Sequence, residues 1–224
     1  YRKPSGSGSN TTGAINITNG KPNSALNEYY QVKNVTVVNN TMVDCDYAIR
    51  VGTVQNSSTT LAPEGVVIAN NIMLNSSISA FQEVSTPKGS VTYQGNITQN
   101  GSWDLNNGTN NNQTVASGLL TSGTDFYRIT SGSAAIDAGT GSYSFLTKDI
   151  LYGNREANFD AGAEEFGAGG TVVPYKVADV GAKLGFGAYQ TLSINDVKIK
   201  QNTLNIYPVP AKSKLTIANN YGSI

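Results

Sequence analysis

The chain has 224 residues, with 15 Lys and Arg against 15 Asp and Glu, and it contains no histidine. The absence of histidine excludes every catalytic triad, general base and metal site that needs an imidazole. Only 13% of the residues are charged, which argues against a nucleic-acid-binding surface, and a single cysteine, Cys45, excludes an internal disulfide. No apolar run approaches the roughly 20 residues that cross a bilayer, so we expect no membrane span.

An internal repeat is the strongest signal in the N-terminal half. Each copy has an apolar strand, a polar corner with asparagine and a second short apolar strand, as in Val35–Met42, Val66–Met73 and Val91–Thr98. The copies are offset by about 31 and about 25 residues, which is the period of a solenoid coil. Coils stacked at ~4.8 Å would place Asn40, Asn71 and Asn96 above one another, where their amides can bond along the stack.

This pattern predicts an all-β fold, a parallel β-helix, with Val37, Ile68 and Tyr93 in an internal apolar column. A β-sandwich whose strands end in asparagine-rich turns is the alternative. The half-match Ala14–Gly20 fits one more coil, so we place the coils at about residues 10–115. Residues 56–60 and 106–113 are expected to form loops that project from the stack.

From about residue 116 the repeat gives way to tight-turn patterns in which glycine follows acidic residues. We predict an irregular C-terminal cap over residues 116–190, which closes the β-helix of residues 1–190. Arg155 is expected to pair with Asp160 or Glu164 and to pin this segment. Residues 191–224 form a separate linker and short β tail, in which two alternating strands flank Pro208 and Pro210.

The tail Leu204–Ile217 resembles the start of the C-terminal sorting domain of type IX secretion substrates in Bacteroidetes, which opens with a Tyr-Pro-Asn-Pro-like turn. Here Val209 stands at the usual asparagine, and the later strands of the domain are absent from the chain, so the sorting domain is truncated. The resemblance implies a secreted or cell-surface protein.

The main body resembles the C-terminal half of polysaccharide lyase family six, the alginate lyase and chondroitinase B group. The supporting stretches are Asn19–Asn34, Asn39–Cys45, Leu61–Ile72, Ser131–Gly139 and Asp160–Phe166. The resemblance implies a right-handed parallel β-helix of the pectin-lyase type. It also implies β-elimination in an anionic uronate polymer such as alginate, with calcium, a lysine base and an arginine acid.

The catalytic motifs of that family precede the segment at which this chain begins, so we assign no catalytic residue, and we expect the chain alone to be inactive. Its Arg-His-Gly motif is absent, since the chain lacks histidine. Asp44 and Asp46 form a lone acidic pair that favours a solvated turn over a calcium site. We therefore expect the calcium ligands, like the missing N-terminal half of the β-helix with which this piece would associate, to lie outside this chain.

Cationic and aromatic side chains can meet the carboxylates and sugar faces of a polymer along a groove. The candidate substrate-binding residues are Arg2, Lys3, Asn27, Tyr29, Tyr30 and Arg50. For Arg50 and the tyrosines, the competing interpretation is a surface ion pair or packing against the stack. For Arg2, the competing interpretation is that it lies in a loose terminus. Trp103 can stack on a sugar or seal a loop against the stack.

Two other function classes remain open. A non-catalytic β-helical adhesin or glycan-binding module needs no catalytic residues. A β-helical hydrolase needs paired carboxylates across a groove, and the sequence offers no convincing pair.

Overall fold

The computed structural model describes residues 13–53, 57–84, 90–104, 112–123 and 126–172. The chain divides into two compact units, Tyr1–Lys176 and Val177–Ile224, and all described residues belong to the first. The predicted tail at 191–224 lies outside the described residues. Within the part of the chain that is described, no helix is long and apolar enough to cross a membrane.

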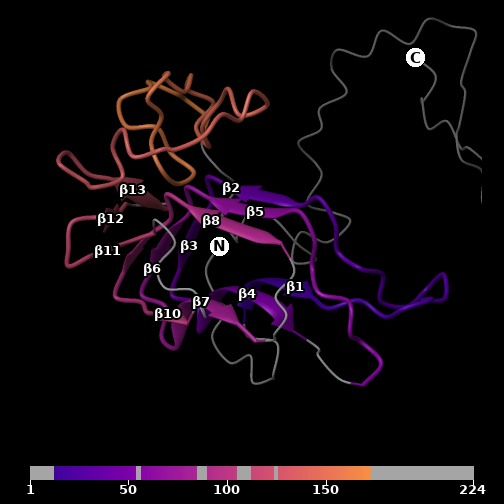
Figure 1. Ribbon diagram of the computed structural model, residues 1–224. Helices are drawn as coiled ribbons and strands as arrows, with labels where there is room; N and C mark the ends of the chain where they lie inside the picture. The colour runs from indigo at the N-terminus through magenta and orange to yellow at the C-terminus, as the bar shows by residue number, and fades with distance from the viewer. Residues whose placement is uncertain (1–12, 54–56, 85–89, 105–111, 124–125, 173–224) are drawn as a thin grey trace, which may run out of the picture. The chain divides into compact units, whose positions relative to one another are not determined.

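The described strands form three parallel sheets and one antiparallel hairpin (Figure 1). The first sheet has the strand order β1 (Gly13–Thr18), β4 (Tyr47–Thr53), β7 (Ser79–Glu83) and β10 (Trp103–Asp104). The second has the order β11 (Gln113–Val115), β9 (Ile97–Gln99), β6 (Ile72–Leu74) and β3 (Thr41–Val43). The third has the order β2 (Thr36–Val38), β5 (Val66–Ala69) and β8 (Val91–Gln94), and the hairpin joins β12 (Leu120–Ser122) to β13 (Tyr127–Ile129).

Consecutive strands belong to different sheets, and the order of sheets repeats along the chain. Strands β2, β3 and β4 contribute one strand to each sheet, and β5, β6 and β7 then pair with them in parallel. Strands β8, β9 and β10 form the next coil. This arrangement is a parallel β-helix, as the repeat predicts, and the alternative sandwich is wrong. The half-match Ala14–Gly20 does belong to the stack, but β1 pairs with β4 and so lies in the first sheet.

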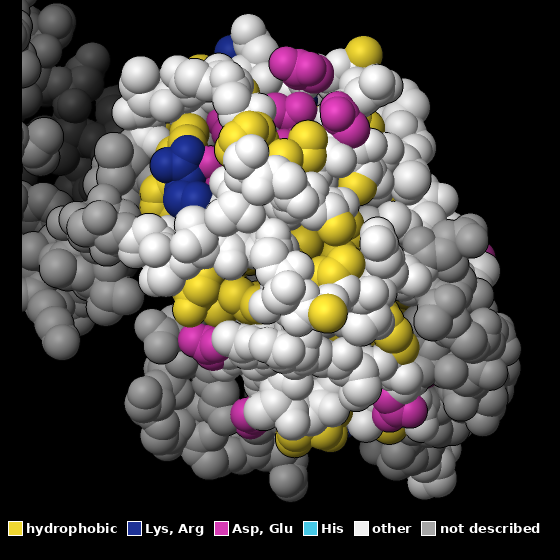
Figure 2. Space-filling view, turned by 90° about the vertical axis from the view of Figure 1, so that its left-hand side faces the viewer, with side chains coloured by type: hydrophobic (Ala, Val, Ile, Leu, Met, Phe, Trp, Pro, Cys, Tyr) yellow, Lys and Arg dark blue, Asp and Glu magenta, His cyan; other side chains and the backbone are white. Residues whose placement is uncertain are grey.

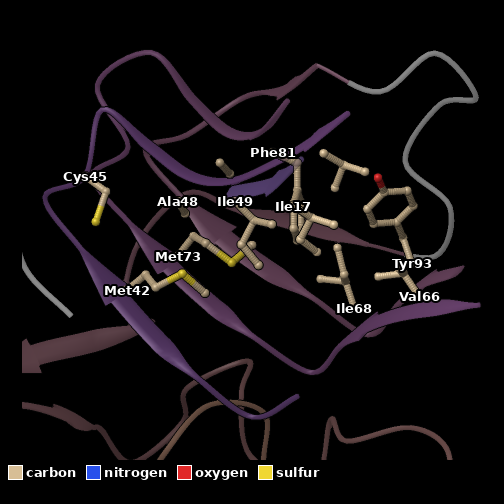
Figure 3. Close-up of a cluster of buried hydrophobic side chains, with 12 residues drawn as sticks. Ile17, Met42, Cys45, Ala48, Ile49, Val66, Ile68, Met73, Phe81 and Tyr93 are labelled. Atoms are coloured by element: carbon tan, nitrogen blue, oxygen red, sulfur yellow. The ribbon is translucent and has the colours of Figure 1, made fainter. Parts of the chain in front are cut away.

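The interior of the coils is a continuous apolar core (Figure 3). Val37, Ile68 and Tyr93 are in register across the third sheet, which confirms the predicted column. A second column crosses the first sheet and contains Ile15, Ile49, Phe81 and Trp103. Strands alternate their side chains between the two faces of a sheet, so the residues between these positions point away from the core.

The coils turn at corners whose backbone adopts the left-handed conformation. Asn39, Asn70 and Gly95 occupy one such corner in successive coils, with φ of 54°, 53° and 62°. Asparagine and glycine tolerate this region better than other residues. Gly95 has a further reason, because a Cβ at this position would collide with Oδ1 of Asn70.

The asparagine ladder forms next to this corner. Asn40 Nδ2 donates to Asn71 Oδ1 over 3.0 Å, and Asn71 Nδ2 donates to Asn96 Oδ1 over 2.9 Å. The ladder continues one coil further than predicted, since Asn96 Nδ2 donates to Asn112 Oδ1 over 2.7 Å. The prediction that residues 106–113 form a projecting loop is thus wrong at its end, where Asn112 and Gln113 belong to the stack.

The cap of residues 116–172 packs along the side of the coils. Ile72 and Ile97 point outward from the second sheet and form a second apolar cluster with the cap residues Leu119, Ile129, Ala135 and Ala161. Asn39 Nδ2 donates to the Asp160 carbonyl over 2.8 Å, and Asn70 Nδ2 donates to the Thr140 carbonyl over 2.9 Å. The cap is therefore fastened to corners of two successive coils.

A buried ion pair holds the cap together, but with a different partner from the one we predicted. Arg155 NH1 lies 3.0 Å from Oε2 of Glu165, and both side chains are 3% exposed. Asp160 receives the guanidinium only through its main-chain carbonyl. Glu164 instead pairs with Arg128 and accepts the Ile129 N–H. Tight turns in this segment direct Glu164 toward Arg128 and the neighbouring Glu165 toward Arg155. The spacing of these residues in the sequence does not reveal this geometry.

Candidate functional site

A column of polar side chains lies on the outer face of the first sheet. Strand register places Asn16, Arg50, Gln82 and Asp104 beside one another, one from each of β1, β4, β7 and β10. They point outward because their neighbours Ile15, Ile49, Phe81 and Trp103 face the core. We call these four residues the outer column.

Hydrogen bonds run along the outer column. Arg50 Nε donates to Gln82 Oε1 over 2.9 Å, and Gln82 Nε2 donates to Asp104 Oδ2 over 3.2 Å. The Arg50 guanidinium also lies 4.6 Å from the centre of the Tyr47 ring, within the range of a cation–π interaction. The column therefore holds its one cation against an aromatic ring on a rigid sheet face.

The sequence prediction identified Arg50 but missed Gln82 and Asp104. A usable signal was present, because Tyr47–Arg50 and Ser79–Gln82 share a pattern in which a small residue and a large apolar residue precede a long polar one. The repeat search aligned only the first two strands of each coil. The third strand follows a corner occupied by Asp44, Asn75 and Asn100 in successive coils, which the aligned segments did not reach, so the column was missed.

The predicted residues Asn27, Tyr29 and Tyr30 lie in the loop between β1 and β2. All three are exposed, and each tyrosine is 55% exposed. Lys21 and Glu28 form an ion pair across this loop, and the Lys21 N–H donates to the Tyr29 carbonyl. The loop projects from the stack after the end of β1 (Figure 1). Arg50, in contrast, lies within a sheet beside Asn16.

The structure thus gives the predicted residues two separate places, a loop and a sheet face. Arg2 and Lys3 lie outside the described residues. Of the two interpretations of Trp103, the structure favours packing against the stack, because its ring stacks on Phe81 at 5.1 Å between centroids. Its indole N–H donates to Thr114 Oγ1 over 2.7 Å, which seals the edge of the core.

The two acidic residues considered as calcium ligands, Asp44 and Asp46, accept hydrogen bonds within turns. Asp44 Oδ1 accepts a hydrogen bond from Asn75 Nδ2, and Asp46 Oδ1 accepts one from Ser77 Oγ. Across the described ranges, no group of three or more His, Cys, Asp or Glu side chains could hold a metal ion. Asp44 and Asp46 therefore serve these turns and belong to no such group among the described residues.

One buried titratable pair lies inside the coils. Glu83 ends β7 with its side chain buried, and burial, followed by the negative charge of Glu83, raises the pKa of the Tyr93 hydroxyl. Tyr93 packs edge-on against Phe81, at 5.5 Å between ring centroids. The pair lies in the core, away from the outer column, so we assign it to structure.

Comparisons with known proteins place this chain in a family. Among solved structures, the PL6 family alginate lyase AlyGC matches with 22% identity and a TM-score of 0.42, over 50% of this chain and 15% of that chain. The chain thus spans less than a fifth of the length of that structure. No curated protein matches. The family model described as Chondroitinase B matches residues 4–135, which is more than half of the 224 residues. The chain belongs to the Chondroitinase B family.

Proposed function

We propose that this chain is the C-terminal, substrate-groove portion of a secreted polysaccharide lyase that cleaves alginate or a related uronate polymer by β-elimination. The family match over residues 4–135 supports the lyase class. The observation that carries the role of this portion is the outer column, with Arg50 at its centre.

The geometry of the outer column suits an extended anionic chain. Coils repeat at ~4.8 Å, so the column offers one polar group per coil along a straight line. The Arg50 guanidinium can meet a uronate carboxylate with charge-assisted hydrogen bonds, and Gln82 and Asn16 can meet hydroxyls. The exposed rings of Tyr29 and Tyr30, in the separate loop between β1 and β2, provide apolar faces for sugar rings.

In β-elimination, a base removes the proton α to the uronate carboxyl group, and the developing negative charge must be stabilised. We assign this chain no base and no acid. Its residues would bind and align the polymer, and the catalytic lysine and arginine would come from the missing N-terminal half of the β-helix. Calcium, which would neutralise the carboxylate in the complete enzyme, would be held there as well.

The proposal extends to location. The resemblance of Leu204–Ile217 to a type IX sorting domain supports export to the cell surface or the medium. Immunodetection of the native protein on the surface or in the medium of the producing cell tests this part of the proposal, and retention inside the cell would contradict it.

The test of the function compares two proteins. The chain should be produced alone and together with the coding region upstream of Tyr1, and each should be incubated with alginate, dermatan sulfate and pectate in calcium. We expect the longer protein to generate unsaturated uronate, seen as ultraviolet absorbance, and the shorter one to generate none. Silence of the longer protein on all three polymers, with retained binding, would favour the non-catalytic glycan-binding or adhesin module.

A further inference from the structure

The cap contains a cavity that the proposed lyase role does not use. Its volume is about 400 Å³, within the usual range for ligand pockets. It lies between residues 141–147 and 154–159, and its walls include Ser142, Tyr143, Thr147, Asn154, Arg155 and Phe159. No residue of the outer column lines it.

The walls of this cavity are fixed by hydrogen bonds to the rest of the unit. The Tyr143 hydroxyl accepts from Gln94 Nε2 over 3.0 Å, which ties one wall to β8. The Arg155 N–H donates to the Thr147 carbonyl over 3.0 Å and joins the two segments. Gly139 lies so close to the Phe159 ring that a Cβ would collide with it. These contacts hold the two segments that form the cavity to each other and to β8.

The chemistry of the walls matches a sugar. Tyr143 and Phe159 supply aromatic surface, which packs against the C–H face of a pyranose ring. Ser142 and Thr147 supply two hydroxyls that can donate and accept hydrogen bonds with sugar hydroxyls. Asn154 supplies an amide whose Nδ2 can donate, while its Oδ1 already accepts from Lys148 Nζ. These three residues are exposed, so an entering ligand can reach them.

The charges of the cavity favour an uncharged ligand. Arg155 is already paired with Glu165, and its NH2 donates to the Gly162 carbonyl over 2.8 Å. Its side chain is 3% exposed, so this guanidinium offers little positive charge to a ligand in the cavity. Glu156 also lines the cavity, and its carboxylate would repel a uronate. Figure 2 shows acidic side chains gathered at the top of the face that it draws, with basic side chains beside them at the upper left.

We propose that this cavity binds a single uncharged pyranose unit and gives the cap a sugar-binding site of its own, separate from the outer column. Because Arg155 is compensated within the protein, binding depends on ring contact and hydroxyl bonding, and it should change little with ionic strength.

The test uses the complete 224-residue chain and saturation-transfer NMR. The probes are the methyl glycosides of glucose, mannose and galactose, with sodium glucuronate as the charged comparator. We expect transfer to at least one methyl glycoside, weaker transfer to glucuronate, and no loss of signal in added salt. Thr147→Trp, which fills the cavity from an exposed position, should abolish the signal.

Thr121→Trp is the matched control, because Thr121 is an exposed threonine of β12 that does not line the cavity. It should leave the signal unchanged. If Thr147→Trp does not fold by circular dichroism, Asn154→Ala replaces it and should weaken the signal. Absence of transfer from all three glycosides, equal signals in the cavity variant and the control, or a preference for glucuronate would each overturn the proposal. The test involves neither alginate nor the upstream region, so its failure leaves the lyase proposal unaffected.

Discussion

Asn71 and Asn96 are joined twice across neighbouring coils: Asn96 Oδ1 accepts the main-chain N–H of Asn71 over 3.0 Å and its side-chain Nδ2 over 2.9 Å. Asn96 Nδ2 then donates to the Ile68 carbonyl and to Asn112 Oδ1. A carboxylate offers no hydrogen-bond donor, and an aliphatic side chain offers neither a donor nor an acceptor. Of these groups, only an amide can both donate and accept, so asparagine can satisfy the backbone groups of the same corner in every coil.

Replacing Asn96 with alanine should therefore be severely destabilising. The change removes this partner from four buried hydrogen-bonding groups. Asn71 Nδ2 keeps the Val37 carbonyl, so three buried hydrogen bonds are lost outright, each at a cost of roughly 1 kcal/mol. We expect the free energy of unfolding, measured in urea, to fall by about 3 kcal/mol. Asn16→Ala is the control, because Asn16 is exposed and should change stability by less than about 0.5 kcal/mol. A similar small change in Asn96→Ala would show that the ladder is not a stabilising element.

The asparagine ladder also marks what the sequence could predict. The repeat reads Val-Thr-Val-Val-Asn-Asn in the first copy and Val-Val-Ile-Ala-Asn-Asn in the second, and it carries both the interior column and the corner. One alignment therefore predicts two sheets and the stacking of Asn40 on Asn71. These features are periodic along the chain, because each coil solves the same local packing problem.

The rest of the molecule depends on contacts without a period. The pairing of Arg155 with Glu165 rather than Glu164 follows from how turns in the cap fold. The cavity in the cap is formed by two segments that meet only in the folded structure. Residue spacing contains no information on such meetings.

The attachment of the cap to the coils can be tested at Asn70. Its Oδ1 accepts the Thr140 N–H over 2.9 Å and the Thr140 hydroxyl over 3.1 Å, and its Nδ2 donates to the Thr140 carbonyl. Asn70→Gly keeps the backbone at its φ of 53° without strain and removes all three bonds. We expect amide hydrogen exchange at residues 137–141 to become faster, while β5 and β6 stay protected.

Asn75→Gly is the matched control for this attachment. Asn75 also has a positive φ, of 55°, but its side chain bonds Asp44 and Asn100 rather than the cap. Exchange at residues 137–141 should match the unmodified chain in this variant. Equal acceleration in both variants would mean that the corner conformation, rather than the bonds to Thr140, governs docking.

Tyr93 should make stability fall at high pH. Its pKa is raised in the folded protein, first by burial and then by Glu83, whereas in the unfolded chain it stays at its ordinary value of about 10. The unfolded state therefore loses a proton first, and the stability present below pH 10 should fall by about 1.4 kcal/mol per pH unit above it. Urea unfolding of the chain and of Tyr93→Phe from pH 9 to 11 isolates this effect, because other groups titrate equally in both. Parallel curves for the two proteins would contradict it.

Substitution of Arg50 tests whether this residue binds the polymer or serves only to pack against its neighbours. If its guanidinium meets uronate carboxylates, Arg50→Gln should weaken binding of an alginate oligosaccharide by about tenfold at low salt, as expected for loss of one charge-assisted contact. Lys33→Gln removes the same charge from an exposed ion pair with Glu64 outside the outer column, so it controls for net charge. Calorimetric titration of the 224-residue chain measures both affinities. Equal affinities in the two variants would assign Arg50 to its contacts with Gln82 and Tyr47 alone, because only a positioned cation distinguishes the outer column from the general charge of the molecule.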